Sequence, residues 1–299
     1  MAAGAKTAAA SNEPPRPVSY PPVILRLLIL SLALVAVSAR AETLAEKTLR
    51  EIVERQKALF AKAEKDGDDV DTARFQGEAQ AIASSYDVFI QNNPTNAAGF
   101  AAYGIFLDKV GMSKQAAAIL LRANKLDGEN PIVKNQIAKL LAEDGKPVEA
   151  LPWLTAAIDL APREAFYHYH MGLLLREGRE FFLKQGGFTR AGLDKSMLDA
   201  FAKAAELAPG NWEFALQHAK AYYDLETPKW EEALGVWQQL ENRPTTAGLR
   251  QLIQLHEAKV LLNLGRSGEA RGLLDRISEP QLAAEKQTLL DEIAKAGAK

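Results

Sequence analysis

A spacing of 34 residues recurs along this chain and constrains its fold more than any other feature. Counted from Ala97, the large–small pair Tyr103 and Gly104 stands at positions 7 and 8, and Gly111 stands at position 15. Small or aliphatic residues follow at positions 20, 24, 27 and 30, namely Ala116, Leu120, Ala123 and Leu126. Repeats with a period of about 20–50 residues indicate stacked units that bury their apolar faces against one another.

The same offsets recur in later windows of the chain. The window from 131 carries Ile137, Ala138, Gly145, Ala150, Leu154 and Ala157, and the window from 251 carries Ala258, Leu261, Gly265, Ala270 and Leu274. Two intervening units are modified. From 165 the register breaks after Leu175 and resumes at Phe201, 13 residues late, which predicts an insertion at 179–195. From 212 the register slips by two residues before Ala233.

The large–small pair, the glycine between helix-like stretches, the alanines at positions 20 and 27 and a closing Leu-x-Pro resemble the tetratricopeptide repeat (TPR) family. This resemblance implies an all-α fold, a right-handed superhelical solenoid of antiparallel helix pairs with an open concave groove. Within a repeat array at 96–279, we expect helix pairs near 97–126, 131–161, 165–208, 212–241 and 250–277. Residues without bulk, such as Gly104, should let two helices approach closely.

The segments that flank the array also carry helical patterns. Residues 42–95 contain two stretches with apolar residues at helical spacing, and they predict a degenerate N-terminal helix pair. Residues 280–299 contain one apolar stripe on an otherwise charged segment, which predicts a capping helix at the C-terminal end.

The first 41 residues have the layout of a secretory signal peptide. An apolar run from Leu27 to Ala39 follows Arg26, and Ala39-Arg40-Ala41 forms an A-x-A pattern. The run is shorter than the roughly 20 residues of a transmembrane helix. We therefore predict cleavage after Ala41 and an exported, periplasmic protein of bacterial type. The alternative is an uncleaved N-terminal anchor that tethers the chain to a membrane.

Composition and motifs favour a non-catalytic protein without a cofactor. The chain has no cysteine, which excludes thiolate metal sites, and its formal charge of −2 gives no basic field for nucleic acid. His168 and His170 point about 200° apart on a helix, so they would not chelate one metal. The acidic segment 64–78 lacks the glycine and glutamate of a calcium loop. It predicts a turn between helices, with Asp71 or Thr72 as the N-cap.

The family resemblance places positions 2, 5, 9, 12 and 13 of each first helix on the concave groove. Position 9 is lysine in three units, as Lys139, Lys220 and Lys259, and Arg176 stands at position 12 of the unit between. Tyr169 and Tyr223 would lie nearby. These residues predict a basic groove that binds an acidic segment or a C-terminal carboxylate of a protein partner. The alternative is that the lysines are merely solvated.

The predicted insertion carries three aromatic residues, Phe181, Phe182 and Phe188, around Gly186-Gly187. One interpretation is that Phe181 and Phe182 extend the first helix and pack on the core. The other is that the aromatic loop lies beside the groove and contacts the partner.

These observations together predict a non-enzymatic scaffold that acts after export and binds a protein or peptide in its concave groove. A membrane-tethered scaffold that organises an envelope complex is the first alternative. An enzyme or metal protein with an unrecognised site is the second.

Overall fold

The computed structural model describes residues 43–243 and 245–297, and over these residues it is helical, with no strand. The predicted all-α class is therefore confirmed. The described chain forms two compact units, which are divided within one helix between Ser85 and Tyr86. The predicted signal segment 1–41 and the cleavage point after Ala41 lie outside the described residues. No helix among the described residues has both the length and the apolar character needed to span a bilayer.

The first unit is built from α1 (Leu44–Asp66), the short 3-10 helix η2 (Gly67–Asp69) and the first part of α2 (Thr72–Asn92). The two α-helices are joined by an aromatic contact between Phe60 and Phe75, whose ring centroids lie 6.1 Å apart. Asp71 caps α2, because its carboxylate accepts a hydrogen bond of 3.0 Å from the backbone of Arg74. The acidic segment is thus a turn between helices, as predicted, and no metal-holding cluster of three His, Cys, Asp or Glu occurs among the described residues.

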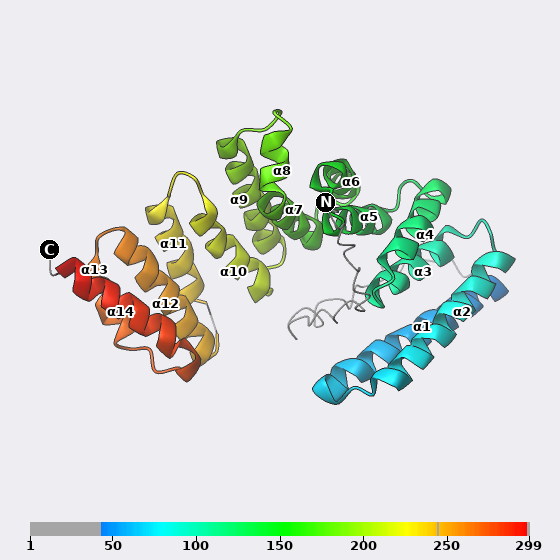
Figure 1. The fold of residues 1–299 in the computed structure, drawn as a ribbon, viewed down its shortest axis with the longest axis horizontal. Coiled ribbons are helices and arrows are strands. Elements are labelled where there is room, and N and C mark those ends of the chain that lie inside the picture. The colour runs from blue at the N-terminus through cyan, green and yellow to red at the C-terminus, as the bar shows by residue number, and fades with distance from the viewer. Residues whose placement is uncertain (1–42, 244, 298–299) are drawn as a thin grey trace, which may run out of the picture. The chain divides into compact units, whose positions relative to one another are not determined.

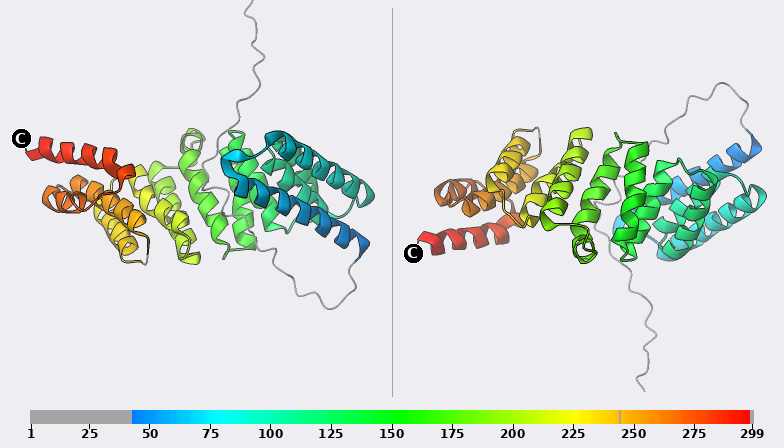
Figure 2. Two further views of the ribbon diagram at one scale, coloured as in Figure 1. Left: turned by 90° about the horizontal axis from the view of Figure 1, so that it is seen from below. Right: turned by 90° about the horizontal axis from the view of Figure 1, so that it is seen from above.

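The second unit contains the end of α2 and five successive helix pairs, followed by α14 (Ala283–Gly297) after the short η4 (Pro280–Leu282). Figure 1 shows these helices following one another in chain order, and the views in Figure 2 show them standing side by side. The first helices of the pairs are α3 (Ala97–Lys109), α5 (Pro131–Glu143), α7 (Ala165–Glu177), α10 (Trp212–Ala221) and α12 (Ala247–Asn263). The second helices are α4 (Ser113–Leu126), α6 (Pro147–Leu160), α9 (Arg190–Leu207), α11 (Trp230–Glu241) and α13 (Ser267–Leu274).

The regular pairs turn at repeat position 15, where three units carry glycine. Gly111, Gly145 and Gly265 have φ angles of 82°, 73° and 74°, in the left-handed region that favours glycine. In each case the next residue donates its backbone N–H to a carbonyl of the last helical turn, as Met112 does to Leu107 at 2.8 Å. This is a Schellman-type helix end, which lets the chain reverse within three or four residues.

The two modified units lack that glycine, and this explains their irregular turns. Position 15 is Arg179 in the third unit, and the chain continues there into an additional helix, α8 (Arg179–Lys184). Position 15 is Glu226 in the fourth unit, where η3 (Tyr222–Asp224) and an extended loop precede α11. The buried Asp194 of α9 ties both irregular turns together. It pairs with Arg179 at 3.3 Å and Arg190 at 2.9 Å, and it accepts the Glu226 backbone N–H at 2.8 Å.

Helices within a pair approach most closely where a glycine faces a large side chain. A Cβ atom on Gly104 would lie 2.5 Å from Cγ of Leu120, and one on Gly172 would lie 2.6 Å from the ring of Phe201. Separations this short are well below van der Waals contact, so no side chain fits at either position without movement. Position 8 is therefore small because the second helix occupies the space, as the repeat pattern predicts.

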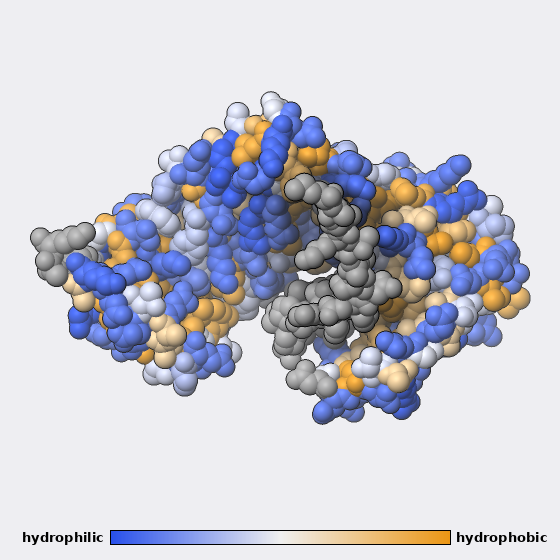
Figure 3. Space-filling view, in the orientation of Figure 1, coloured by the Kyte–Doolittle hydropathy of each residue, from blue (hydrophilic) through white to orange (hydrophobic). Residues whose placement is uncertain are grey.

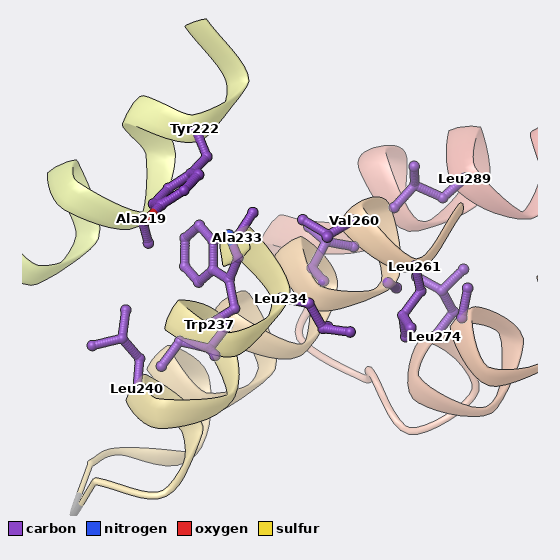
Figure 4. Packing of buried hydrophobic residues seen from close by; sticks show 14 of the residues in the cluster. Ala219, Tyr222, Ala233, Leu234, Trp237, Leu240, Val260, Leu261, Leu274 and Leu289 are labelled. Atoms are coloured by element: carbon purple, nitrogen blue, oxygen red, sulfur yellow. The ribbon is translucent and has the colours of Figure 1, made fainter. Parts of the chain in front are cut away.

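The core of the last two pairs surrounds Trp237 of α11, which is completely buried. Figure 4 shows Trp237 near residues of α10 and α11, namely Ala219, Tyr222, Ala233 and Leu240. Val260 and Leu261 of α12, Leu274 of α13 and Leu289 of α14 lie at the other side of the same cluster. The C-terminal helix thus covers apolar surface that a further repeat would otherwise cover, which is the role of a capping element.

Candidate functional site

The candidate site is the surface formed by repeat positions 5, 6, 9 and 12 of the successive first helices, with η3 supplying position 12 of the fourth unit. We call this surface the first-helix face. Side chains at these positions contact the next first helix along the chain, so each junction between units has its own polar arrangement. These four junctions decide which of the predicted groove residues remain available to a partner.

The junction between α3 and α5 neutralises Lys139. Its ammonium group donates to Asp108 at 2.8 Å and lies 3.0 Å from the carboxylate of Glu143. Asp108 also accepts a hydrogen bond from Gln136. Burial by itself lowers the pKa of Lys139, but Asp108 and then Glu143 outweigh it and raise this pKa. Lys139 is therefore held within the protein by two carboxylates.

The junction between α5 and α7 carries no charged pair. Position 12 of α5 is Ala142 and position 9 of α7 is Leu173, so neither can take part in one. Instead His170 contacts Asn135 at 2.8 Å, and its ring centroid lies 4.2 Å from that of Phe166. Burial, and then the charge of Lys139, lowers the pKa of His170 to about 4. This histidine is thus neutral and packed.

The junction between α7 and α10 holds two of the predicted groove residues in place. The Tyr169 hydroxyl donates to Glu213 at 3.2 Å, and its ring stacks on Phe214 at 4.7 Å between centroids. The Arg176 guanidinium donates to Gln217 at 2.9 Å and lies 5.5 Å from the centre of the Phe201 ring. Gln217 is neutral, but the Arg176 guanidinium also pairs with the adjacent Glu177 at 3.6 Å, so its charge is partly compensated.

The junction between α10 and α12 is built around His256. The Tyr223 hydroxyl donates to the His256 carbonyl at 3.3 Å, and the His256 ring stacks on Trp237 at 4.4 Å. The Lys259 ammonium lies 5.1 Å from the centre of the Tyr223 ring, within the range of a cation–π contact. Burial, then Lys220, then Lys259, lowers the pKa of His256 to about 4. Both lysines therefore lie close enough to His256 to oppose its protonation.

Lys220 and Lys259 differ from Lys139 in lacking an acidic partner. Both are half-buried, and neither forms an ion pair with another described residue. The difference follows from position 12 of the preceding unit, which is Asp108 before Lys139, Arg176 before Lys220 and Tyr223 before Lys259. Lys139 is consequently paired at the α3–α5 end of the first-helix face, whereas Lys220 on α10 and Lys259 on α12 have no acidic partner among the described residues.

The three aromatic residues of the insertion differ in how far they are buried. Phe182 is completely buried against Gly178 and the core of the third unit, so it is a packing residue and not a surface contact. Phe181 is 49% exposed and Phe188 is 36% exposed, and the Phe188 ring rests edge-on against Phe182 at 5.1 Å. Figure 3 shows hydrophobic surface gathered over α8. The interpretation that Phe181 and Phe182 both pack on the core therefore applies to Phe182 alone.

The residues that sequence reasoning missed are the partners of the predicted ones. Asp108 neutralises Lys139, Gln217 holds Arg176, and His256 lies beside two lysines. The signal was present, because Asp108 stands at position 12 like Arg176 and Tyr223, and Gln217 and His256 both stand at position 6. Reading position 12 of one unit against positions 6 and 9 of the next would have found all three.

No family model matches the chain, and no curated protein matches its sequence. Solved structures share its fold. PilW, a type IV pilus biogenesis factor, matches with a TM-score of 0.54 at 13% identity, over 84% of this chain and 100% of PilW. The structure of Naa15/Naa10 bound to HypK-THB matches with a TM-score of 0.51 at 13% identity, over 85% of this chain. YrrB, described as a TPR protein with an unusual peptide-binding site, gives 0.40 at 19% identity, over 76% of this chain and 99% of YrrB.

This chain spans 35% of the chain that it matches in the Naa15/Naa10 structure. Identities this low establish the fold and nothing finer. Helix pairs that repeat in one register, together with these structural neighbours, show that the chain has the TPR-like solenoid fold that its sequence predicts.

Proposed function

We propose that this chain is a non-catalytic protein-binding scaffold, and that its first-helix face takes an acidic segment or a C-terminal carboxylate of a partner. One observation carries the proposal. Lys220 and Lys259 project from adjacent first helices onto one surface, and neither has an acidic partner among the described residues. Two uncompensated lysines beside a buried neutral histidine favour a ligand that brings its own negative charge.

The surroundings of the two lysines suit a peptide better than a small anion. Arg176 of the neighbouring unit, held in position by Gln217 at 2.9 Å, adds a positive charge that Glu177 compensates only in part, at 3.6 Å. The Tyr223 ring lies beside Lys259 and offers an apolar contact next to the charge. At physiological salt an exposed charge acts over only about 8 Å. Cations on three different helices, α7, α10 and α12, are therefore matched best by acidic residues that are spread along a segment.

Proteins of this fold occur in assemblies. PilW is a pilus biogenesis factor, and the Naa15/Naa10 structure contains bound HypK. These neighbours support a scaffold role, and PilW is consistent with our proposal that the chain acts after export, in the periplasm. In that proposal the chain is cleaved after Ala41. The alternative is an uncleaved anchor and a membrane-tethered scaffold, and mass spectrometry of the N-terminus of the mature protein distinguishes the two.

A crosslinked pull-down of the full chain, followed by a charge-reversal comparison, tests the binding face. The test variant is Lys220→Glu with Lys259→Glu. The control is Lys114→Glu with Lys125→Glu on the second helix α4, where both lysines are exposed and form no ion pair with a described residue. Exposed charge pairs contribute ~0.2–1 kcal/mol each, so reversing both groove lysines should weaken binding roughly tenfold at low salt. Lys139 is left intact because Asp108 and Glu143 hold it.

Synthetic peptides of the captured partner distinguish recognition of a C-terminal carboxylate from recognition of an acidic segment. If a C-terminal carboxylate is recognised, amidation of the peptide C-terminus removes binding; if an acidic segment is recognised, amidation has little effect and neutralising its acidic residues removes binding. Equal affinity of the test and control variants for the partner at low salt would refute the first-helix face as the binding surface.

A further inference from the structure

A polar pocket lies on the other side of α12 from the first-helix face. It is open to solvent and has a volume of about 540 Å³. Its polar lining comes from three helices and their ends: Gln238, Glu241 and Asn242 of α11, Glu257 of α12, and Glu269 and Arg276 from α13 and the residues after it. Glu257 and Lys259 are two residues apart, so their side chains point about 200° apart around the helix.

Glu257 is the unusual residue of this pocket. It is only 3% exposed, and its Oε1 atom accepts no hydrogen bond from any described residue. A buried carboxylate without a donor is costly, and it is stabilised either by a proton or by a cation. Burial, and then the charge of Glu241, raises the pKa of Glu257 to about 7. Near neutral pH the group is therefore divided between the protonated form and a carboxylate that lacks a partner.

The pocket as a whole is negative. Glu241 accepts a hydrogen bond from the neutral Gln254 at 2.6 Å and forms no ion pair with a described residue, whereas Glu269 is paired with Arg266 at 2.7 Å. Arg276, the one basic residue in the lining, is exposed and forms no ion pair with a described residue. Helix α14 contributes no residue to the lining. The C-terminal end of α11 also meets the pocket at Asn242, and the carbonyl groups there add partial negative charge.

We propose that this pocket binds the guanidinium group of an arginine side chain from a partner protein. A guanidinium presents five N–H donors in a planar fork, which suits the two carboxylates of Glu257 and Glu241 with the amide oxygens of Gln238 and Asn242 beside them. An ammonium group has three donors and no such plane. This surface is independent of the lysine-rich first-helix face, so the partner can contact both sides of α12 with opposite charges.

Binding of the cation must displace the proton of Glu257, and this makes the affinity depend on pH. The groups that face Glu257 are Glu241 from α11 and Glu269 and Arg276 from the α13 side, and among them only Glu241 appreciably affects its protonation. With half-protonation near pH 7, the carboxylate is about 10% populated at pH 6 and about 90% populated at pH 8. The affinity should therefore rise about tenfold from pH 6 to pH 8, and binding at pH 7 should release about half a proton.

Isothermal titration calorimetry of the full chain with N-acetyl-arginine methylamide tests the proposal. Titrations at pH 6 and pH 8 measure the change in affinity, and titrations at pH 7 in buffers of different ionisation enthalpy measure the released proton. The expected result is saturable binding that is tighter at pH 8 and weaker for the corresponding blocked lysine.

Two variants and one control assign the binding to this pocket. Glu257→Gln should lose most of the affinity and all of the pH dependence, and Glu241→Gln should lower the affinity while retaining proton release. Glu292→Gln, an exposed acid on α14 outside the lining, should bind like the unmodified chain. The absence of saturable binding at pH 8, or unchanged affinity in a folded Glu257→Gln or Glu241→Gln variant, would overturn the proposal.

Discussion

Replacing Gly104 by alanine should leave the repeat array less stable than the same replacement of Gly235 does. Both glycines lie inside helices, so each substitution gains about 1 kcal/mol of helix propensity. The new methyl group at Gly104 would lie 2.5 Å from Cγ and 2.8 Å from Cδ2 of Leu120, and 3.3 Å from its backbone nitrogen. At Gly235 it would meet nothing within 4 Å. Overpacking costs ~1–3 kcal/mol, so the two variants should differ by about that amount.

Urea unfolding of the full chain, followed by far-ultraviolet circular dichroism, measures the difference. Gly104→Ala should unfold at the same or a lower urea concentration than the unmodified chain, and Gly235→Ala at a higher one. Repeat arrays can unfold in stages, so the slope of the transition must be compared as well as its midpoint. Gly186 is not a suitable control, because its φ of 77° strains any side chain even though the space around it is open.

A double-mutant cycle identifies the obstruction. If Leu120 is the residue that meets the new methyl group, Gly104→Ala should cost less in a Leu120→Ala background than alone. Equal stability of Gly104→Ala and Gly235→Ala, or an unchanged cost in the Leu120→Ala background, would show that α3 and α4 do not pack as described.

Four further variants test other parts of the structure. Phe182→Ala should lower the stability by ~3–5 kcal/mol in urea unfolding because Phe182 is completely buried, whereas Phe181→Ala, at a half-exposed site on the same short helix, should change it by under ~0.5 kcal/mol. Asp194→Ala should cost ~3–5 kcal/mol in the same assay, because Arg179 and Arg190 lose their buried carboxylate. The pKa of Glu257 rises from 4.5 to about 7 on folding, so its contribution to stability is complete below pH 4.5 and is lost as the pH rises through 7. Glu257→Gln should remove that loss, about 3 kcal/mol, and a series of unfolding curves from pH 4 to pH 8 measures it.

The sequence allows the helix pairs to be predicted because their signals are local and repeated. Each regular unit carries its own glycine at position 15 and its own small residue at position 8, and agreement between copies identifies the register. The repeat register also predicts which units are irregular, because the spacing fails in those units. The form of the irregularity was not predictable from the spacing alone, although Arg179 and Glu226 at position 15 explain why the standard turn is missing.

The charge state of the first-helix face could not be predicted from single helices. Lys139 is neutralised by Asp108, which is 31 residues earlier in the chain and on another helix. Phe181 and Phe182 likewise differ in exposure only because of how α8 packs on the core. Charge pairing and exposure depend on which residue of one element meets which residue of the next. For the lysines, the repeat register predicts these contacts only when position 12 of one unit is compared with positions 6 and 9 of the following unit.

Similar units can form a surface whose two ends differ in charge, because each lysine depends on a residue of the preceding unit. Lysine at position 9 is shared by three units, yet its consequence is set by the residue at position 12 of the unit before it. An acid there, as at Asp108, turns the lysine into a structural ion pair, whereas Arg176 and Tyr223 leave Lys220 and Lys259 without an acidic partner. The array is thus built from one repeated backbone plan, and a single variable position divides its first-helix face into an end where the lysine is paired and an end where two lysines have no acidic partner. A partner that is acidic along its length would therefore be drawn towards the α7–α12 end of the face, because attraction between exposed charges acts only over short distances at physiological salt.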